Sequence, residues 1–467
     1  MTKSIRSGIL AFAVLSSIAM AQTTEEKIKE LQTQIDALKS KVNESSDNKS
    51  KVNESSKWSY TKFEGAKYDG GDDFAFEMTN QLQAHWTFSA IDAGSDTSNF
   101  TVRRARTTFS GHVFNKDLLY KLQLDAVDSG SSGDGNIKEG HMTWQFLTLG
   151  NYEANDLTKD KPEAPKRNKD TVGLRFGQGK VLFGLEGTGS SRGLFFVERS
   201  SASRGFADGY SRGAWLVGSA MQNRLRWSAG AMNTDVAGGL GAGYTDRGEE
   251  ASNSDNEMSY TAMANFDPLG DFNGGKGTEA FKQGDFRMRD AEGTKQNPKF
   301  PLRGTVGVGL ALGNGRDTAA FEDVESTSIN INTAWSFEGF QVLGEYYMRS
   351  DDLQGATSDT EDSSGWTVSG TYLLPKNGTS EMRWGVGLRF GQVSSDNGDN
   401  GTVNYVTGLQ GLGAAEGDST EITVVVDAFY HGHAAKSQIE YTFQDVDFST
   451  GNDPTNHILR VGFQLLF

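Results

Sequence analysis

The sequence predicts an all-β protein: a 16-stranded antiparallel transmembrane β-barrel with a short N-terminal coiled-coil helix. Three observations carry this prediction, namely an export signal at the N-terminus, a hydrophobic period of two residues over most of the chain, and connections that alternate between short and long. The composition agrees, because 57 Gly and 7 Pro in 467 residues suit many glycine-containing strands better than two soluble domains. The absence of Cys excludes a disulfide framework and thiolate metal sites.

Residues 1–21 have the form of a signal peptide. Lys3 and Arg6 precede an apolar run over 9–20, which ends in the cleavage pattern Ala19-Met20-Ala21. This run has twelve residues, whereas a membrane-spanning helix needs roughly 20. We therefore expect cleavage after Ala21 and export to the bacterial outer membrane. Cleavage removes two of the 45 basic residues and none of the 61 acidic ones, and so large an acidic excess argues against binding to nucleic acid.

Residues 22–43 are predicted to form a periplasmic coiled coil. Apolar residues recur there at spacings of three and four, as on the contact face of a coiled coil: Ile28, Leu31, Ile35, Leu38 and Val42. A helix this short is marginal alone in water, so we expect it to associate with the helices of other subunits. A single amphipathic helix is the alternative. Residues 44–75 are predicted to be a polar tether. One heptapeptide occurs at 40–46, across the start of this tether, and again at 50–56.

Residues 76–467 alternate between apolar and polar side chains in segment after segment. In the last segment, the odd positions from Leu459 to Phe467 are apolar throughout, whereas the even positions include Arg460 and Gln464. A membrane barrel needs this pattern, because each strand has one face in lipid and the other toward the lumen. Sixteen segments follow it: 76–90, 100–114, 118–127, 139–148, 171–177, 213–222, 223–233, 257–266, 303–313, 327–337, 339–349, 365–374, 382–393, 421–430, 434–446 and 456–467.

The connections between these segments test the barrel independently, since such barrels have short periplasmic turns and long external loops. An even strand number places both ends of the barrel on the periplasmic side. Connections such as 115–117 and 338–339 are tight and periplasmic, whereas 178–212 is long and external. The connections 149–170 and 267–302 are long although they are periplasmic. They are either insertions or contain missed strands, so a count of eighteen strands is the alternative.

The strand faces that do not meet lipid carry more bases than acids. Within the strands, eleven bases lie on these faces, compared with four acids, which are Asp125, Glu345, Asp427 and Glu440. When residues at segment ends are included, the counts are twelve bases and eight acids. Arginines in a narrow, low-dielectric passage favour anions. The alternative is that these bases are structural, paired across the lumen or extended toward strand ends. The candidate pore-lining bases within the strands are Arg104, Arg106, Lys121, Arg175, Arg224, Arg226, Arg303, Arg383, Arg389, Lys436 and Arg460.

Two stretches carry more specific motifs. Residues 101–106 read Thr-Val-Arg-Arg-Ala-Arg and are followed by Tyr-Lys-Leu-Gln-Leu-Asp at 120–125, and residues 174–200 run from Leu-Arg-Phe-Gly-Gln-Gly-Lys to Phe-Val-Glu-Arg-Ser. They resemble the opening strand pair and the third loop of the phosphate-selective porin O and P family. The resemblance implies trimeric porins whose third loop narrows the barrel, and it adds Lys180, Arg192 and Arg199 to the anion path. Residues 180–183 read Lys-Val-Leu-Phe where the family usually has Lys-Glu-Pro-Phe.

These features predict an outer-membrane porin for the passive diffusion of small hydrophilic solutes, with a preference for anions and, by the resemblance, for phosphate-like anions. We expect outer-membrane lipid and a homotrimer as partners, and neither catalysis, a cofactor nor a metal. His431 and His433 are the only His residues close in sequence, and a tight turn is a poor metal site. Two alternatives remain: a general porin without selectivity, and a structural link to the cell wall in which the N-terminal segment binds peptidoglycan.

Overall fold

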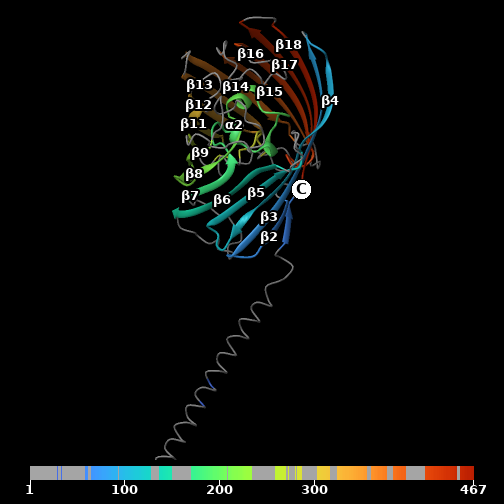
Figure 1. Ribbon diagram of the computed structural model, residues 1–467. Coiled ribbons are helices and arrows are strands. Elements are labelled where there is room, and N and C mark those ends of the chain that lie inside the picture. Colours follow the sequence, from blue (N-terminus) through green and yellow to red (C-terminus); the bar gives the residue numbers. More distant parts are fainter. Residues whose placement is uncertain are drawn as a thin grey trace, which may run out of the picture. The chain divides into compact units, whose positions relative to one another are not determined.

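The chain divides into two units, residues 1–58 and 59–467, and the second is a barrel (Figure 1). The predicted signal peptide lies outside the described residues, as do almost all of the predicted coiled coil and the first part of the tether. No helix within the described part of the chain is long and apolar enough to cross a membrane. The computed structural model describes residues 29, 33, 58–61, 65–92, 94–127, 136–149, 170–207, 209–233, 258–269, 272, 279, 281–286, 302–315, 323–354, 359–375, 382–395, 416–449 and 453–467.

Sixteen antiparallel strands close the barrel, and β18 pairs with β3 to complete the ring. Each predicted segment overlaps one of them, so the predicted 16-stranded antiparallel barrel is confirmed. Two extra strands, β1 (Trp58–Thr61) and β2 (Gly65–Asp69), precede the ring, and β2 pairs with the start of β3. The barrel strands are β3 (Phe74–Ile91), β4 (Thr97–Val113), β5 (Leu118–Asp125), β6 (Asn136–Leu149), β7 (Asp170–Lys180), β8 (Tyr210–Ala220), β9 (Leu225–Met232), β10 (Ser259–Phe266), β11 (Arg303–Gly315), β12 (Asp323–Phe337), β13 (Phe340–Gln354), β14 (Asp359–Leu373), β15 (Arg383–Ser395), β16 (Gly417–Phe429), β17 (Ala435–Phe448) and β18 (Thr455–Leu466).

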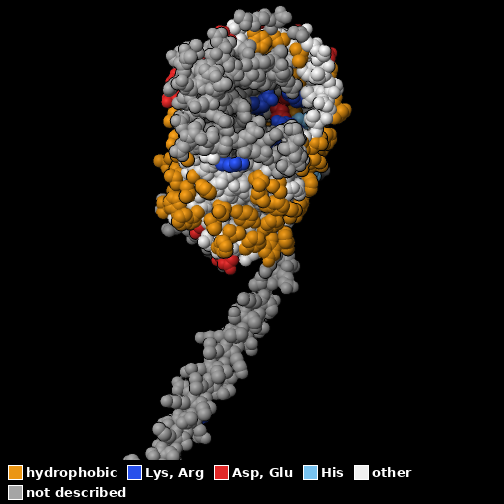
Figure 2. Space-filling view, in the orientation of Figure 1, with side chains coloured by type: hydrophobic (Ala, Val, Ile, Leu, Met, Phe, Trp, Pro, Cys, Tyr) orange, Lys and Arg blue, Asp and Glu red, His pale blue; other side chains and the backbone are white. Residues whose placement is uncertain are grey.

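The alternation of side chains along each strand gives the barrel an apolar outside and a polar inside. On β15, Leu388 and Phe390 are exposed on the outer face, whereas Arg389 between them is buried in the lumen. Figure 2 shows hydrophobic side chains over much of the outer surface, and charged side chains inside a hollow near the upper end of that view. This is the distribution that a lipid-facing barrel with a wet interior requires.

The tight periplasmic connections have backbone conformations that suit short hairpins. Glu338 and Gly339, between β12 and β13, have φ values of 45° and 87°. Two successive positive φ values give a turn whose twist matches that of the flanking strands. The short connection is therefore compatible with continuous pairing from Phe337 with Phe340 upward.

The third external connection, residues 181–209 between β7 and β8, folds into the lumen, and we call it the inserted loop. It contains the short helices α2 (Leu185–Thr188), η2 (Ser191–Gly193) and α3 (Ser201–Phe206). Figure 1 shows α2 within the ring of strands. Phe183 is completely buried, and Val181 and Leu182 are nearly so, in a cluster that includes wall residues. The Val-Leu pair that departs from the family pattern thus forms part of the apolar attachment of the loop.

The long periplasmic connection between β10 and β11 also enters the lumen. None of its described residues, 267–269, 272, 279, 281–286 and 302, belongs to a strand. Phe281 is buried against Leu185 of the inserted loop and against Leu343 of the wall. Residues 279 and 281–286, which we call the periplasmic insert, are therefore an insertion and not a missed strand pair. The other long periplasmic connection, predicted over 149–170, lies outside the described residues between its two ends.

Candidate functional site

Apolar packing fills one side of the lumen and leaves the other side polar. Phe183 of the inserted loop packs with Trp215 and Tyr347 of the wall, and Phe195 packs with Phe429. These clusters extend across β8 to β16. Among the described residues, two cavities of the lumen have walls that come mainly from β3 to β9. The polar path through the barrel is therefore off-centre.

The smaller cavity, about 130 Å³, lies between the inserted loop and strands β3 to β6, and we call it the constriction. Arg192 crosses from η2 to the wall, where its Nη2 donates to Thr108 Oγ1 at 2.6 Å. Lys121 Nζ lies 2.7 Å from both carboxylate oxygens of Glu139. Hydroxyl groups supply much of the remaining lining: Thr79, Thr108, Ser110, Thr188, Ser190 and Ser191. The constriction thus offers charged and neutral hydrogen-bond donors from two sides.

The larger cavity, about 420 Å³, extends from the constriction toward the periplasmic ends of β4 to β9. Its two arginines are paired. Arg175 forms a two-pronged ion pair with Glu279 of the periplasmic insert, at 3.0 and 2.8 Å, and Arg226 Nη2 lies 2.7 Å from Asp267 Oδ1. Charge in this vestibule is therefore nearly balanced.

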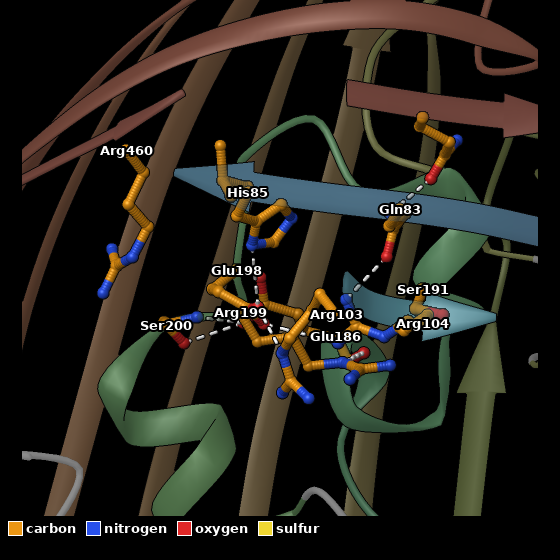
Figure 3. Close-up of polar contacts among 12 residues, drawn as sticks. Gln83, His85, Arg103, Arg104, Glu186, Ser191, Glu198, Arg199, Ser200 and Arg460 are labelled. Atoms are coloured by element: carbon orange, nitrogen blue, oxygen red, sulfur yellow. Dashed lines mark hydrogen bonds and ion pairs between the residues drawn. The ribbon is translucent and has the colours of Figure 1, made fainter. Parts of the chain in front are cut away.

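Glu198 of the inserted loop is the centre of a second cluster (Figure 3). This cluster contacts β4 nearer its external end than the constriction does. Its carboxylate lies 2.7 Å from Arg103 Nε and 3.3 Å from Arg104 Nη2. Arg104 also donates to Gln83 Oε1 at 2.7 Å. Burial raises the pKa of a carboxyl group, but the charges of Arg104 and Arg103 outweigh this and hold the pKa of Glu198 well below its usual range. The loop is thus tied to β4 by an ionised carboxylate.

Wall glutamates hold the backbone of the inserted loop. Glu345 accepts hydrogen bonds from the backbone N–H groups of Leu185 and Glu186, at 2.6 and 3.1 Å. Glu440 accepts from the N–H of Val197 at 2.8 Å. Glu421 accepts from the Ser201 hydroxyl at 2.6 Å. Buried backbone donors need such partners, so these wall acids serve to anchor the loop.

Two lumen bases escaped the sequence analysis because β-bulges change the phase of the alternation. In β4, Gln83 pairs with Arg104 but Ala84 pairs with Val102, so Arg103 is the extra residue and reaches Glu198 from inside. In β6 the same shift makes Lys138 extra, and its side chain is buried near the ring of Tyr210. Two consecutive charged residues in a strand, Arg103 with Arg104 and Lys138 with Glu139, were the sequence feature that could have indicated each bulge.

The predicted pore-lining bases separate into three groups. Arg104, Arg199, Arg389, Lys436 and Arg460 contact the inserted loop or an acid that holds it; Arg389 Nη1, for example, donates to the Glu198 carbonyl at 2.9 Å. Arg224, Arg303 and Arg383 lie at or beside strand starts at the periplasmic end. The bases at the two cavities are Arg106, Lys121, Arg175, Lys180, Arg192 and Arg226.

Comparison with known proteins agrees with this architecture. The structure resembles the outer-membrane channel DcaP of Acinetobacter baumannii, with a TM-score of 0.53 and 12% identity over 85% of this chain and 98% of that one. It also matches an anion-selective porin from Comamonas acidovorans, with a TM-score of 0.49 and 8% identity over 85% and 100%. No curated protein sequence matches the chain. A model of the family "Phosphate-selective porin O and P" matches residues 76–382, and the chain therefore belongs to this family of outer-membrane porins.

Proposed function

We propose that this porin lets small hydrophilic solutes diffuse passively across the outer membrane and that it prefers anions, with phosphate-like oxyanions as the class that the family name suggests. The solute path follows the polar side of the lumen, through the vestibule and the constriction. Transport down a concentration gradient requires no chemical step, so we assign no catalytic residue, cofactor or metal. The cell-wall anchor alternative depends on residues 22–43, which lie almost wholly outside the described part of the chain.

The position of Arg192 is the observation that carries the anion preference. The inserted loop brings its guanidinium into the constriction, where it donates a hydrogen bond to the Thr108 hydroxyl group of the wall. Two wall bases at this level, Arg106 and Lys121, lie 2.6 and 2.7 Å from a carboxylate, and a third, Lys180, donates to two backbone carbonyls of the inserted loop. Arg192 therefore supplies positive potential in the smaller cavity, together with several donors in a planar array that suits an oxyanion.

The neighbouring hydroxyl groups strengthen this assignment. An oxyanion passing Arg192 leaves part of its hydration shell, and the Ser and Thr hydroxyls of the constriction can donate in place of water. A cation passing the same point loses water and meets the like charge of Arg192. The constriction thus discriminates by charge at one side chain and tolerates different anions through adaptable hydroxyl donors.

Reversal potentials across planar bilayers in a KCl gradient test this proposal. The wild-type channel should favour chloride over potassium. An ion passing about 5 Å from Arg192 interacts with its charge by about 0.8 kcal/mol in water, which is a factor of about four for each ion. The sign is opposite for chloride and potassium, so Arg192→Gln should lower the chloride-to-potassium permeability ratio by up to about 16-fold. Lys116→Gln removes the same charge from an exposed periplasmic turn and should leave the ratio unchanged. A cation-favouring wild-type channel would overturn the proposal.

A further inference from the structure

The constriction and the vestibule share part of their lining. Of the residues that line the two cavities, Ser110, Lys121 and Glu279 are common to both. We call these three the neck. Ser110 and Lys121 come from neighbouring wall strands, β4 and β5, whereas Glu279 comes from the periplasmic insert. A carboxylate from a connection far away in the sequence therefore faces the path of the solute.

Glu279 is held in place by its own side chain and by the described residues that follow it. Its carboxylate is fixed by the two-pronged contact with Arg175 of β7. Two residues further on, Phe281 is 2% exposed in a cluster with Leu185 and Leu343. Gln283 then donates its backbone N–H to the carbonyl of Gly193 at 2.8 Å. This part of the insert is thus anchored to the inserted loop and to the wall, and a fixed carboxylate is what a selective neck requires.

The side chain of Glu279 nevertheless reaches water. It keeps 27% of its surface exposed, compared with 12% for Arg175 and 3% for Glu139, the acid that pairs with Lys121. The negative charge therefore remains available to an ion in the neck, whereas most of the Arg175 guanidinium is covered. The Glu279–Arg175 pair is neutral in sum but presents its acidic partner to the path.

From this geometry we propose that Glu279 is a selectivity-determining residue, which opposes the bases of the constriction and keeps the pore from excluding cations. The periplasmic insert thus acts as a second selectivity element. It is distinct from the inserted loop and lies on its periplasmic side. The inference rests on the proposed permeation path through both cavities, but it does not depend on which ion the wild-type channel prefers.

Neutralising this carboxylate in the full-length channel tests the inference. The charge of Glu279 changes the Boltzmann factor of an ion about 5 Å away by about fourfold in water, in opposite directions for chloride and potassium. Glu279→Gln should therefore raise the chloride-to-potassium permeability ratio by up to about 16-fold. The double variant Glu279→Gln with Arg175→Gln restores the net charge of the pair and should return the ratio toward the wild-type value. If collapse of the insert caused the change, the double variant would stay altered, and the inference would be wrong.

The absence of Cys in the chain allows a direct test of position. Glu279→Cys introduces a single thiol, which we expect to react with water-soluble methanethiosulfonate reagents in the open channel. A reagent that carries a sulfonate should bring the permeability ratio back toward the wild-type value, and one that carries a trimethylammonium group should move it further toward chloride. A thiol that does not react, or reagents of opposite charge with equal effects, would place Glu279 outside the path.

The outcomes separate this inference from the proposed function. A wild-type channel that favours potassium contradicts the anion preference, yet a shift toward chloride in Glu279→Gln still supports the neck. A chloride-favouring wild-type channel whose ratio is unaffected by Glu279→Gln supports the proposed function and overturns the neck. A wild-type barrel that conducts no ions overturns both.

Discussion

The attachment of the inserted loop at Glu198 leads to a quantitative prediction. Glu198→Gln keeps the shape of the side chain but removes the charge that faces Arg103 and Arg104, and it leaves two guanidinium groups without their shared carboxylate. Removing one partner of a buried ion pair costs about 3 to 5 kcal/mol. The Gln amide oxygen can still accept one hydrogen bond. We therefore take the lower figure, about 3 kcal/mol, for the loss of docking free energy of the inserted loop.

Hydrogen exchange measures this loss where it occurs. The backbone N–H groups of Val197 and Ser201 donate to the wall acids Glu440 and Glu421. These amides exchange when the loop undocks. A loss of about 3 kcal/mol raises the open fraction by about 150-fold, so exchange over 197–204 should accelerate by about two orders of magnitude while exchange in the barrel strands stays unchanged.

The control is Glu325→Gln, which removes the same charge from an exposed position on β12. It should leave exchange in the inserted loop at the wild-type rate. An acceleration below about tenfold in Glu198→Gln would show that the Arg103 and Arg104 contacts do not hold the loop, and the apolar clusters would then be its main attachment. Equal acceleration throughout the barrel would indicate global destabilisation and would also contradict the prediction.

Three further predictions follow from the insert, from Glu279 and from the family. Phe281→Ala should destabilise the docked insert by about 3 to 5 kcal/mol and increase single-channel conductance in bilayers, because its cluster holds the insert in the lumen. Burial raises the pKa of Glu279, but the charge of Arg175 outweighs this and lowers the pKa to about 2. The contribution of Glu279 to the permeability ratio should therefore be constant from about pH 8 to about pH 4. The ratio should shift toward chloride as the pH falls further, because the carboxylate is then protonated. Chemical cross-linking of the purified protein should give trimers, and monomers alone would contradict the predicted assembly.

The sequence predicts the barrel well because each strand repeats the same constraint. Every strand has one face in lipid, so an apolar phase such as that from Leu459 to Phe467 recurs through the chain and reveals all sixteen strands. The lumen phase follows from it, and Arg104, Arg389 and Lys436 are buried inside as that phase predicts. The prediction fails at Arg103 and Lys138, where one extra residue in a bulge exchanges the two faces.

The contacts inside the lumen were beyond the reach of the sequence because they join distant segments. Nothing in the spacing of Arg175 and Glu279, 104 positions apart, indicates that they meet. The same holds for Glu198 with Arg104. A long periplasmic connection is a local feature, and the sequence predicted it. Its folding into the lumen depends on the packing of Phe281 against Leu185, which only the closed barrel brings together.

A count of lumen charges alone therefore misjudges the pore. Glu345 and Glu440 compensate backbone N–H groups of the inserted loop, and Lys436 donates to a backbone carbonyl of that loop, so these charges act on the loop rather than on a passing ion. The bases and acids that remain at the water-filled cavities are few. Since an ion responds most strongly to the nearest charge that it can approach, we expect selectivity to depend on the balance between Arg192 in the constriction and the exposed carboxylate of Glu279, more than on the excess of arginines along the wall.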